Sequence, residues 1–148
     1  MSSATIQAEL IAKLAADRRI PYPEEIAVDA SDVGVTLRGT VGSFAQRRAA
    51  GDDARKVEGV TDVFNELQVR VLDEYAREDA EIRGAALQSL MWDAELHADS
   101  IDVKVEDGWV TLSGQVEFQF QSDDAFDDVA SLSGVTGITN KIKVVESL

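Results

Sequence analysis

The sequence contains no cysteine, a single histidine and only two prolines among its 148 residues. Without cysteine, neither a disulfide framework nor a thiolate metal site can form. His97 has no second histidine near it in a metal-binding or catalytic spacing, so we expect a structural or surface residue. Neither a G-x-S-x-G sequence nor a glycine-rich phosphate loop occurs. These absences predict a protein that is not an enzyme.

Basic residues and long apolar runs are also scarce. The chain has 14 Lys and Arg against 28 Asp and Glu, a formal charge of −14. This balance argues against binding to nucleic acid and against adsorption to anionic lipid, because both need clustered cations. No run approaches the ~18 apolar residues of a membrane span, and Gln7, Glu9 and Lys13 interrupt the N-terminal segment. We therefore expect a cytoplasmic protein, or a periplasmic one if the sequence has been trimmed.

The sequence contains a long internal repeat. Residues 30–41 read ASDVGVTLRGTV and residues 105–116 read VEDGWVTLSGQV. A shift of 75 positions places residues 26–69 over 101–144 without a gap. A repeat of this length is the size of a small domain rather than of a solenoid unit. We predict two tandem domains, residues 1–72 and 73–148.

Hydrophobic periodicity predicts the same element order in both domains. The spacing of Ile6, Leu10, Ile11 and Leu14 is one face of a helix, and the alternation that begins at Ile26 indicates a strand. A second strand, a second helix and a third alternating strand follow. Each domain therefore reads helix, strand, strand, helix, strand. This order predicts an α+β fold, with two helices packed on one face of a three-stranded sheet.

Turn residues mark the ends of these elements. Asp107-Gly108 predicts a type I′ hairpin, whereas the equivalent Asp32-Val33 should give a distorted turn because valine resists positive φ. Gly59 and Gly134 lie where a left-handed residue ends the second helix. We expect the two remaining repeated glycines to let the backbone bend where the second strand ends. They are Gly39 and Gly114.

Two motifs resemble the BON domain family, named for bacterial osmotically inducible and nodulation proteins. The first is V-T-L-x-G-x-V after a short hairpin. The second is Gly-Val-x-x-V-x-N-x-[LI]-x-V, which runs over residues 59–69 and, with Ile138 in place of valine, over residues 134–144. Both motifs occur twice and cover nearly the whole chain, so the resemblance indicates two tandem copies.

The resemblance implies a non-enzymatic module for the osmotic or envelope stress response. It implies contact with membrane phospholipid or with protein surfaces, and no catalytic residues. Two alternatives remain open, namely a sensor of potassium or another cation and a chaperone-like holdase. Exposed aromatic side chains in the second domain would favour the holdase.

Four carboxylates near the start of the second domain's second helix form a candidate cation site. They are Asp123, Asp124, Asp127 and Asp128. Stacked carboxylates could hold Ca²⁺ weakly, or K⁺ together with backbone carbonyls. Acids in the first turns of a helix also complement its dipole, and no EF-hand spacing is present. The solvated-face interpretation is therefore the simpler one.

Basic and aromatic residues supply candidate binding surfaces. Two basic pairs on the first domain's second helix could bind phosphates, or could meet the acidic second domain within one molecule or in a homo-oligomer. They are Arg47, Arg48, Arg55 and Lys56. The second domain is richer in aromatic residues, and we expect most of these rings in the core, with any surplus forming a contact patch. They are Trp92, Trp109, Phe118, Phe120 and Phe126.

Overall fold

A computed structural model describes residues 2–71, 77–96 and 98–145. The chain divides into two compact units, residues 1–70 and 71–148, here called the first and the second unit. The predicted boundary between residues 72 and 73, like His97, lies outside the described residues. Each unit has the predicted α+β order of helix, two strands, helix and third strand, which confirms the fold class.

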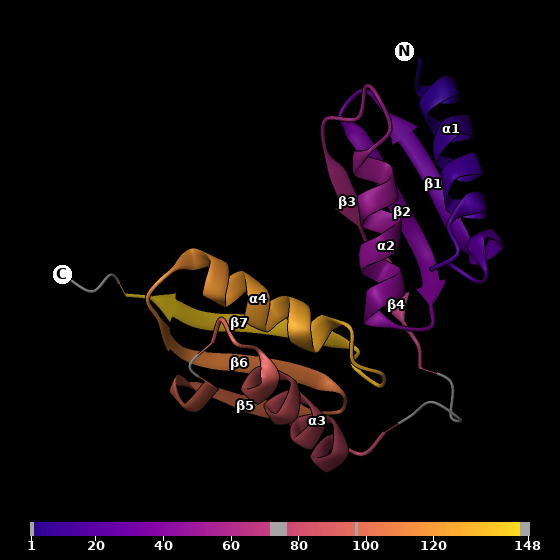
Figure 1. Cartoon of the computed structure of the whole chain (residues 1–148). Coiled ribbons are helices and arrows are strands. Elements are labelled where there is room, and N and C mark those ends of the chain that lie inside the picture. The colour runs from indigo at the N-terminus through magenta and orange to yellow at the C-terminus, as the bar shows by residue number, and fades with distance from the viewer. Residues whose placement is uncertain (1, 72–76, 97, 146–148) are drawn as a thin grey trace. The chain divides into compact units, whose positions relative to one another are not determined.

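The first unit packs two helices on one face of a mixed sheet (Figure 1). Its elements are α1 (Ser3–Ala16), a short 3₁₀ helix (Pro23–Glu25), β1 (Ile26–Ser31), β2 (Gly34–Val41), α2 (Phe44–Arg55), β3 (Val63–Asn65) and β4 (Gln68–Val69). Strand β2 pairs antiparallel with β1 and parallel with β3 and β4. The core lies between the sheet and the helices, where Leu10, Leu14 and Leu37 are fully buried. Ile11, which the periodicity placed on the same face, is instead 49% exposed.

The second unit repeats this architecture. Its elements are α3 (Asp79–Trp92), a short 3₁₀ helix (Ala98–Ser100), β5 (Ile101–Glu106), β6 (Trp109–Val116), α4 (Gln119–Ala130) and β7 (Gly137–Val144). The strand order is β5-β6-β7, with β6 antiparallel to β5 and parallel to β7. Ile82, Leu90 and Leu112 are fully buried beneath the helices. The opposite face of the sheet is open and carries polar side chains such as Lys104 and Thr111.

The third strand differs between the units. In the first unit it breaks into β3 and β4 around Leu67, which turns inward and is buried, whereas β7 is continuous. The side chain of Asn65 accepts the N–H of Leu67, and Arg47 donates to the carbonyls of both residues. The motif asparagine and a helix arginine therefore satisfy the polar groups that the break leaves unpaired.

The turn glycines adopt the left-handed region of backbone space. Asp107 and Gly108 have φ of 52° and 78°, the positive values that a type I′ turn needs. In the first hairpin the positive φ falls on Gly34 instead. The expectation that Gly39 and Gly114 mark the end of the second strand is wrong, because β2 and β6 continue to Val41 and Val116.

Candidate functional site

The basic residues of α2 are partly used by the fold itself. The Arg47 guanidinium donates to the Leu67 carbonyl at 3.0 Å and to the Asn65 carbonyl, and the Asn65 side chain donates back to the Arg47 carbonyl at 2.8 Å. Arg55 forms a surface ion pair with Asp52 at 3.3 Å, and Lys56 is exposed. Arg47 is therefore committed to holding the third strand against α2.

Replacing Arg47 with alanine is expected to destabilise the first unit by about 1.5–3 kcal/mol, because two strand carbonyls lose a charged hydrogen-bond donor. Thermal unfolding followed by circular dichroism measures this loss. Arg55→Ala is the matched control on the same helix and should change stability by less than ~0.5 kcal/mol, since its ion pair is exposed. Equal effects of the two substitutions would show that Arg47 has no special role.

The four candidate carboxylates of α4 lie in different environments. Asp123 and Asp127 are exposed, Asp124 is half-buried, and Asp123 accepts a hydrogen bond from Gln119 at 3.1 Å. Asp128 interacts with Asp93, which follows α3, as well as with Asp124 and Asp127 of its own helix. Within residues 2–71, 77–96 and 98–145, no group of three or more Asp, Glu or His side chains is arranged to hold a metal ion. A cation at this helix stays a prediction.

Asp128 belongs to a half-buried carboxyl pair with Asp93. Burial is the main cause that raises its pKa to about 7, followed by a hydrogen bond to Asp93 and by repulsion from Asp93, Asp124 and Asp127. Its Oδ2 atom is buried without a hydrogen-bond partner. The second unit therefore keeps an acidic pair whose proton is retained up to nearly neutral pH.

The first unit contains the same pair with a cation added. Before the first strand of each unit the repeats align at a shift of 76 positions, and after it at 75, so Asp17 and Asp53 correspond to Asp93 and Asp128. Arg19 lies 2.8 Å from Asp17 and 3.5 Å from Asp53. The Arg19 guanidinium holds the pKa of Asp17 well below its usual range, while burial raises the pKa of Asp53 to about 6. Neither pair belongs to the two repeated motifs, although both acids of each pair align between the repeats.

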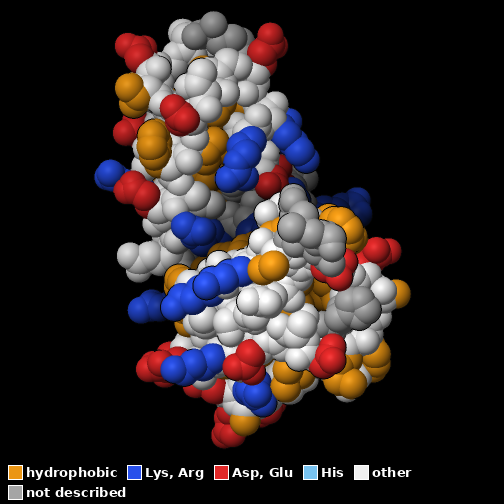
Figure 2. All heavy atoms as spheres, turned by 90° about the vertical axis from the view of Figure 1, so that its left-hand side faces the viewer, with side chains coloured by type: hydrophobic (Ala, Val, Ile, Leu, Met, Phe, Trp, Pro, Cys, Tyr) orange, Lys and Arg blue, Asp and Glu red, His pale blue; other side chains and the backbone are white. Residues whose placement is uncertain are grey.

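The expectation that most aromatic rings of the second unit lie in the core is wrong. Their exposed fractions are 78% for Trp92, 48% for Trp109, 55% for Phe118 and 47% for Phe120, while Phe126 is half-buried. On the face shown in Figure 2, hydrophobic side chains reach the surface in separate small patches among charged ones. The exposed rings are thus available for contacts outside their own unit.

Phe118 and Phe120 form a stacked pair at the start of α4. Their ring centroids are 5.7 Å apart and their planes differ by 14°. Phe118 occupies the N-cap position, where the first unit has Ser43, whose hydroxyl accepts the Gln46 N–H at 3.1 Å. A phenyl ring has no acceptor atom, so the start of α4 lacks this cap.

Gln121 binds the backbone just before α4, as Gln46 does before α2 in the first unit. Its Oε1 accepts the N–H groups of Glu117 and Phe118 at 3.0 and 3.1 Å, and its Nε2 donates to the Glu95 carbonyl at 3.0 Å. Gln121 is buried, so these bonds fix the backbone on which the two rings stand. The exposed pair therefore stands at a backbone segment that is held by these hydrogen bonds.

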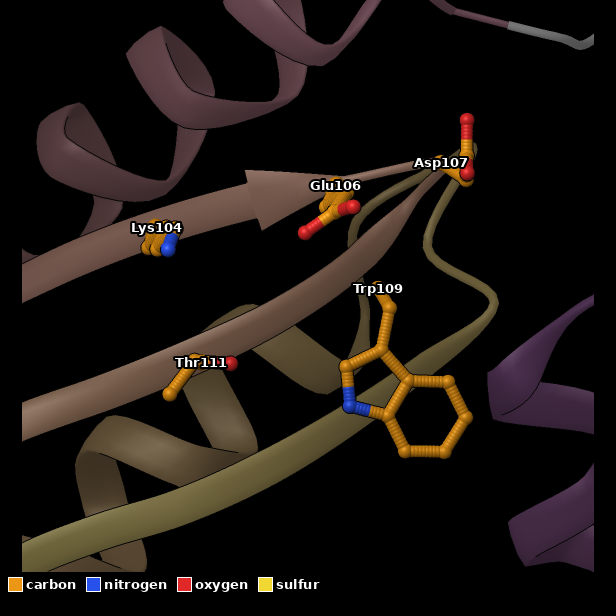
Figure 3. Close-up of a pocket in the computed structure, with 5 residues that line it drawn as sticks. All are labelled: Lys104, Glu106, Asp107, Trp109 and Thr111. Carbon is orange, nitrogen blue, oxygen red and sulfur yellow. The ribbon is translucent and has the colours of Figure 1, made fainter.

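Trp109 lies on the open face of the second sheet, at the hairpin tip. Its indole N–H donates to Thr139 Oγ1 at 2.8 Å, and a Cβ on Gly137 would stand 2.3 Å from the ring. The ring therefore rests on a glycine that no other residue could replace without displacing it. The ring borders a hollow of about 260 Å³, which is lined by Lys104, Glu106, Asp107, Trp109 and Thr111. Figure 3 shows these five side chains.

No helix among the described residues is both long enough and apolar enough to span a bilayer. The basic, acidic and aromatic candidates do not converge on one centre within either unit. Two features emerge from the structure that the sequence did not predict: the stacked Phe118–Phe120 pair and the packing of Trp109 on Gly137. Both lie at positions where the two repeats differ.

Comparisons with known proteins agree with the repeated fold. Osmotically-inducible protein Y of Escherichia coli strain K12 is 36% identical over 127 residues, which cover 80% of this chain. The chain spans 61% of the length of that relative.

Two solved structures of CdsD, a structural protein of the type III secretion system of Chlamydia trachomatis, also match. One has a TM-score of 0.41 and 11% identity, covering 99% of this chain and 65% of that chain. The other, a C-terminal domain, has a TM-score of 0.40 and 10% identity, covering 98% of this chain and 68% of that one.

The family comparison is more informative, because it finds the BON domain twice, at residues 2–71 and 78–146. These two matches cover nearly all the described residues of both units. The chain therefore belongs to the BON domain family and consists of two tandem copies of that domain.

Proposed function

We propose that this chain is a non-enzymatic binding module of the osmotic stress response, which contacts protein surfaces through exposed aromatic rings of its second unit. The observation that carries the proposal is the Phe118–Phe120 pair, two stacked rings about half exposed at the start of α4. The name of the Escherichia coli relative supports the link to osmotic stress.

Phe118 is a poor N-cap residue for α4, which favours a role in contacts with a partner over a role in folding. A serine at this N-cap position, as in the first unit, would stabilise the helix by about 1 kcal/mol. Rigid exposed aromatic side chains are frequent anchors of protein interfaces, because their apolar area is buried with little loss of conformational entropy. A residue that weakens its own helix yet presents such an anchor fits a binding role.

Charge favours a protein partner over a phospholipid surface. Residues 73–148 hold 5 basic and 17 acidic side chains, so anionic headgroups would be repelled from the unit that carries the rings. Exposed Glu117 and Asp123 flank the pair. The partner best suited to this surface is an apolar segment with lysine or arginine beside its hydrophobic residues.

The test replaces the pair with the residues of the first unit. Phe118→Ser with Phe120→Ala should weaken binding of a leucine-lysine peptide at least tenfold, because truncation of interface anchors costs about 2 kcal/mol or more. Isothermal titration calorimetry on the full chain measures this affinity. A peptide with glutamate in place of lysine should bind the wild type poorly.

Stability separates lost binding from lost folding. Phe118→Ser alone should stabilise the second unit, whereas Ser43→Ala should destabilise the first unit by about 1 kcal/mol and leave binding unchanged. Wild-type affinity in the double variant would refute the role of the pair. Equal binding to neutral and anionic phospholipid vesicles, with none to the peptides, would favour the membrane alternative instead.

A further inference from the structure

We infer that the hollow beside Trp109 is a binding site for a neutral sugar ring, separate from the protein-binding pair. The indole is held in place by contacts within the second unit. Its N–H is bound by Thr139 at 2.8 Å and one side of its ring rests on Gly137. Trp109 is still 48% exposed, and its ring lies over β7 and borders the hollow (Figure 3).

The packing of Trp109 on Gly137 occurs in the second unit and has no counterpart in the first. At the positions of Trp109 and Gly137, the first unit has Gly34 and Asp62. The fold therefore does not require the tryptophan, and the glycine beneath it appears only in the copy that carries the ring. Both residues serve to place one flat apolar surface on a polar sheet face.

The side chains that line the hollow can both donate and accept hydrogen bonds. Lys104 pairs across the hairpin with Thr111, and Glu106 pairs with Trp109, so an ammonium, a hydroxyl and a carboxylate line the hollow beside the ring. The side chain of Asp107 points away from the ring in Figure 3. A sugar offers apolar C–H groups for the ring, and its hydroxyl groups both donate and accept hydrogen bonds.

The lining carries charges of both signs, so a ligand of either charge meets at least one group that repels it. An anionic ligand such as a nucleotide would meet Glu106 in an acidic unit, and a quaternary ammonium ion would meet Lys104. A neutral polyhydroxylated ligand uses both groups without repulsion. The volume of about 260 Å³ lies just below the usual range for small-molecule pockets, so the hollow has room for a single ring, either free or as one unit of a glycan chain.

The experiment uses the full chain with Trp92→Phe, so that Trp109 is the one remaining fluorophore of its kind. Glucose, N-acetylglucosamine and their β-1,4-linked tetramers are titrated, and the Trp109 fluorescence and indole N–H resonance are followed. We expect saturable shifts with a Kd on the order of 1 mM. Tighter binding of a tetramer than of its monomer would identify a glycan rather than a free sugar.

Variants of the lining decide between ligand classes. Gly137→Ala keeps the indole but removes its seat, and should abolish the response of the N–H resonance to sugar. Glu106→Gln and Lys104→Gln should each weaken sugar binding by only a few-fold. Absence of any saturable response in the parent protein, or a response to choline or AMP alone, would overturn the inference. Peptide binding through the Phe118–Phe120 pair should be unchanged in all three variants, so the two proposals can fail independently.

Discussion

Replacing Asp128 with asparagine is expected to stabilise the second unit by about 1–2 kcal/mol at about pH 8 and to have little effect below about pH 4. Burial and the neighbouring Asp93 raise the pKa of Asp128 from 3.8 to about 7 in the folded chain. Asparagine preserves the size of the side chain but never takes up the charge that this site disfavours.

The sign follows from proton binding in the two states. Below pH 3.8 both the folded and the unfolded chain hold the proton of Asp128, so the burial of this group has no ionisation cost. Between pH 3.8 and about 7 only the folded chain retains it, and stability falls as the pH rises. Above this range the full cost is present. The whole shift would correspond to ~4 kcal/mol, and partial exposure reduces the expected value.

The first unit shows how the same pair is stabilised by a cation. The N–H of Arg19 donates to the carboxylate of Asp17 at 2.9 Å, and the N–H of Glu95 donates to that of Asp93 at 2.9 Å. Glu95 therefore takes the place of Arg19, with the opposite charge. Glu95→Arg should place a guanidinium beside the pair of the second unit and stabilise it at neutral pH.

Urea unfolding at a series of pH values, followed by tryptophan fluorescence, measures these effects, because both tryptophans lie in the second unit. Asp53→Asn is the matched control, followed by circular dichroism. It removes an ion pair to Arg19 together with the repulsion from Asp17, so we expect little net gain. Parallel stability profiles of wild type and Asp128→Asn between about pH 4 and 8 would contradict the pairing of Asp93 with Asp128.

The sequence predicted the fold because the relevant signals are local. Alternation in β5 and the helical spacing of Leu10 and Leu14 depend on neighbours a few positions away, and Asp107-Gly108 fixes a turn without help from the rest of the chain. The repeat then supported each assignment a second time. These elements are where expectation and structure agree.

The candidate sites were harder to predict because they depend on packing. Asp93 follows the last residue of α3 and Asp128 lies in α4, so the two meet only when α3 lies against α4. The rings of Phe118 and Phe120 were expected in the core because they are apolar, yet the N-cap position points away from it. The alignment of Phe118 with Ser43 was the available signal, since a serine followed by a helix marks a cap rather than a core position.

Replacing Gly114 with alanine is expected to destabilise the second unit by at least about 3 kcal/mol. Gly114 has φ of 127°, a backbone conformation that L side chains rarely adopt, and a Cβ there would stand 2.0 Å from the Ser100 carbonyl oxygen. That oxygen belongs to the backbone just before β5, so it cannot move away without separating the two strands that Gly114 joins through its pairing with Ile101.

Gly39 is in the same position in the first unit, with φ of 125° and the Glu25 carbonyl oxygen 2.1 Å from an added Cβ. This close approach explains why the repeated V-T-L-x-G sequence keeps its glycine inside a strand rather than at its end.

Gly84→Ala is the matched control, because an added Cβ there meets nothing within 4 Å and the first unit already has Ala8 at that position. It should stabilise α3 by about 0.5–1 kcal/mol. Urea unfolding followed by tryptophan fluorescence compares the two variants directly. If Gly114→Ala were as stable as Gly84→Ala, the Ser100 carbonyl would have to move aside at no cost in stability. The close approach would then not explain the repeated glycine.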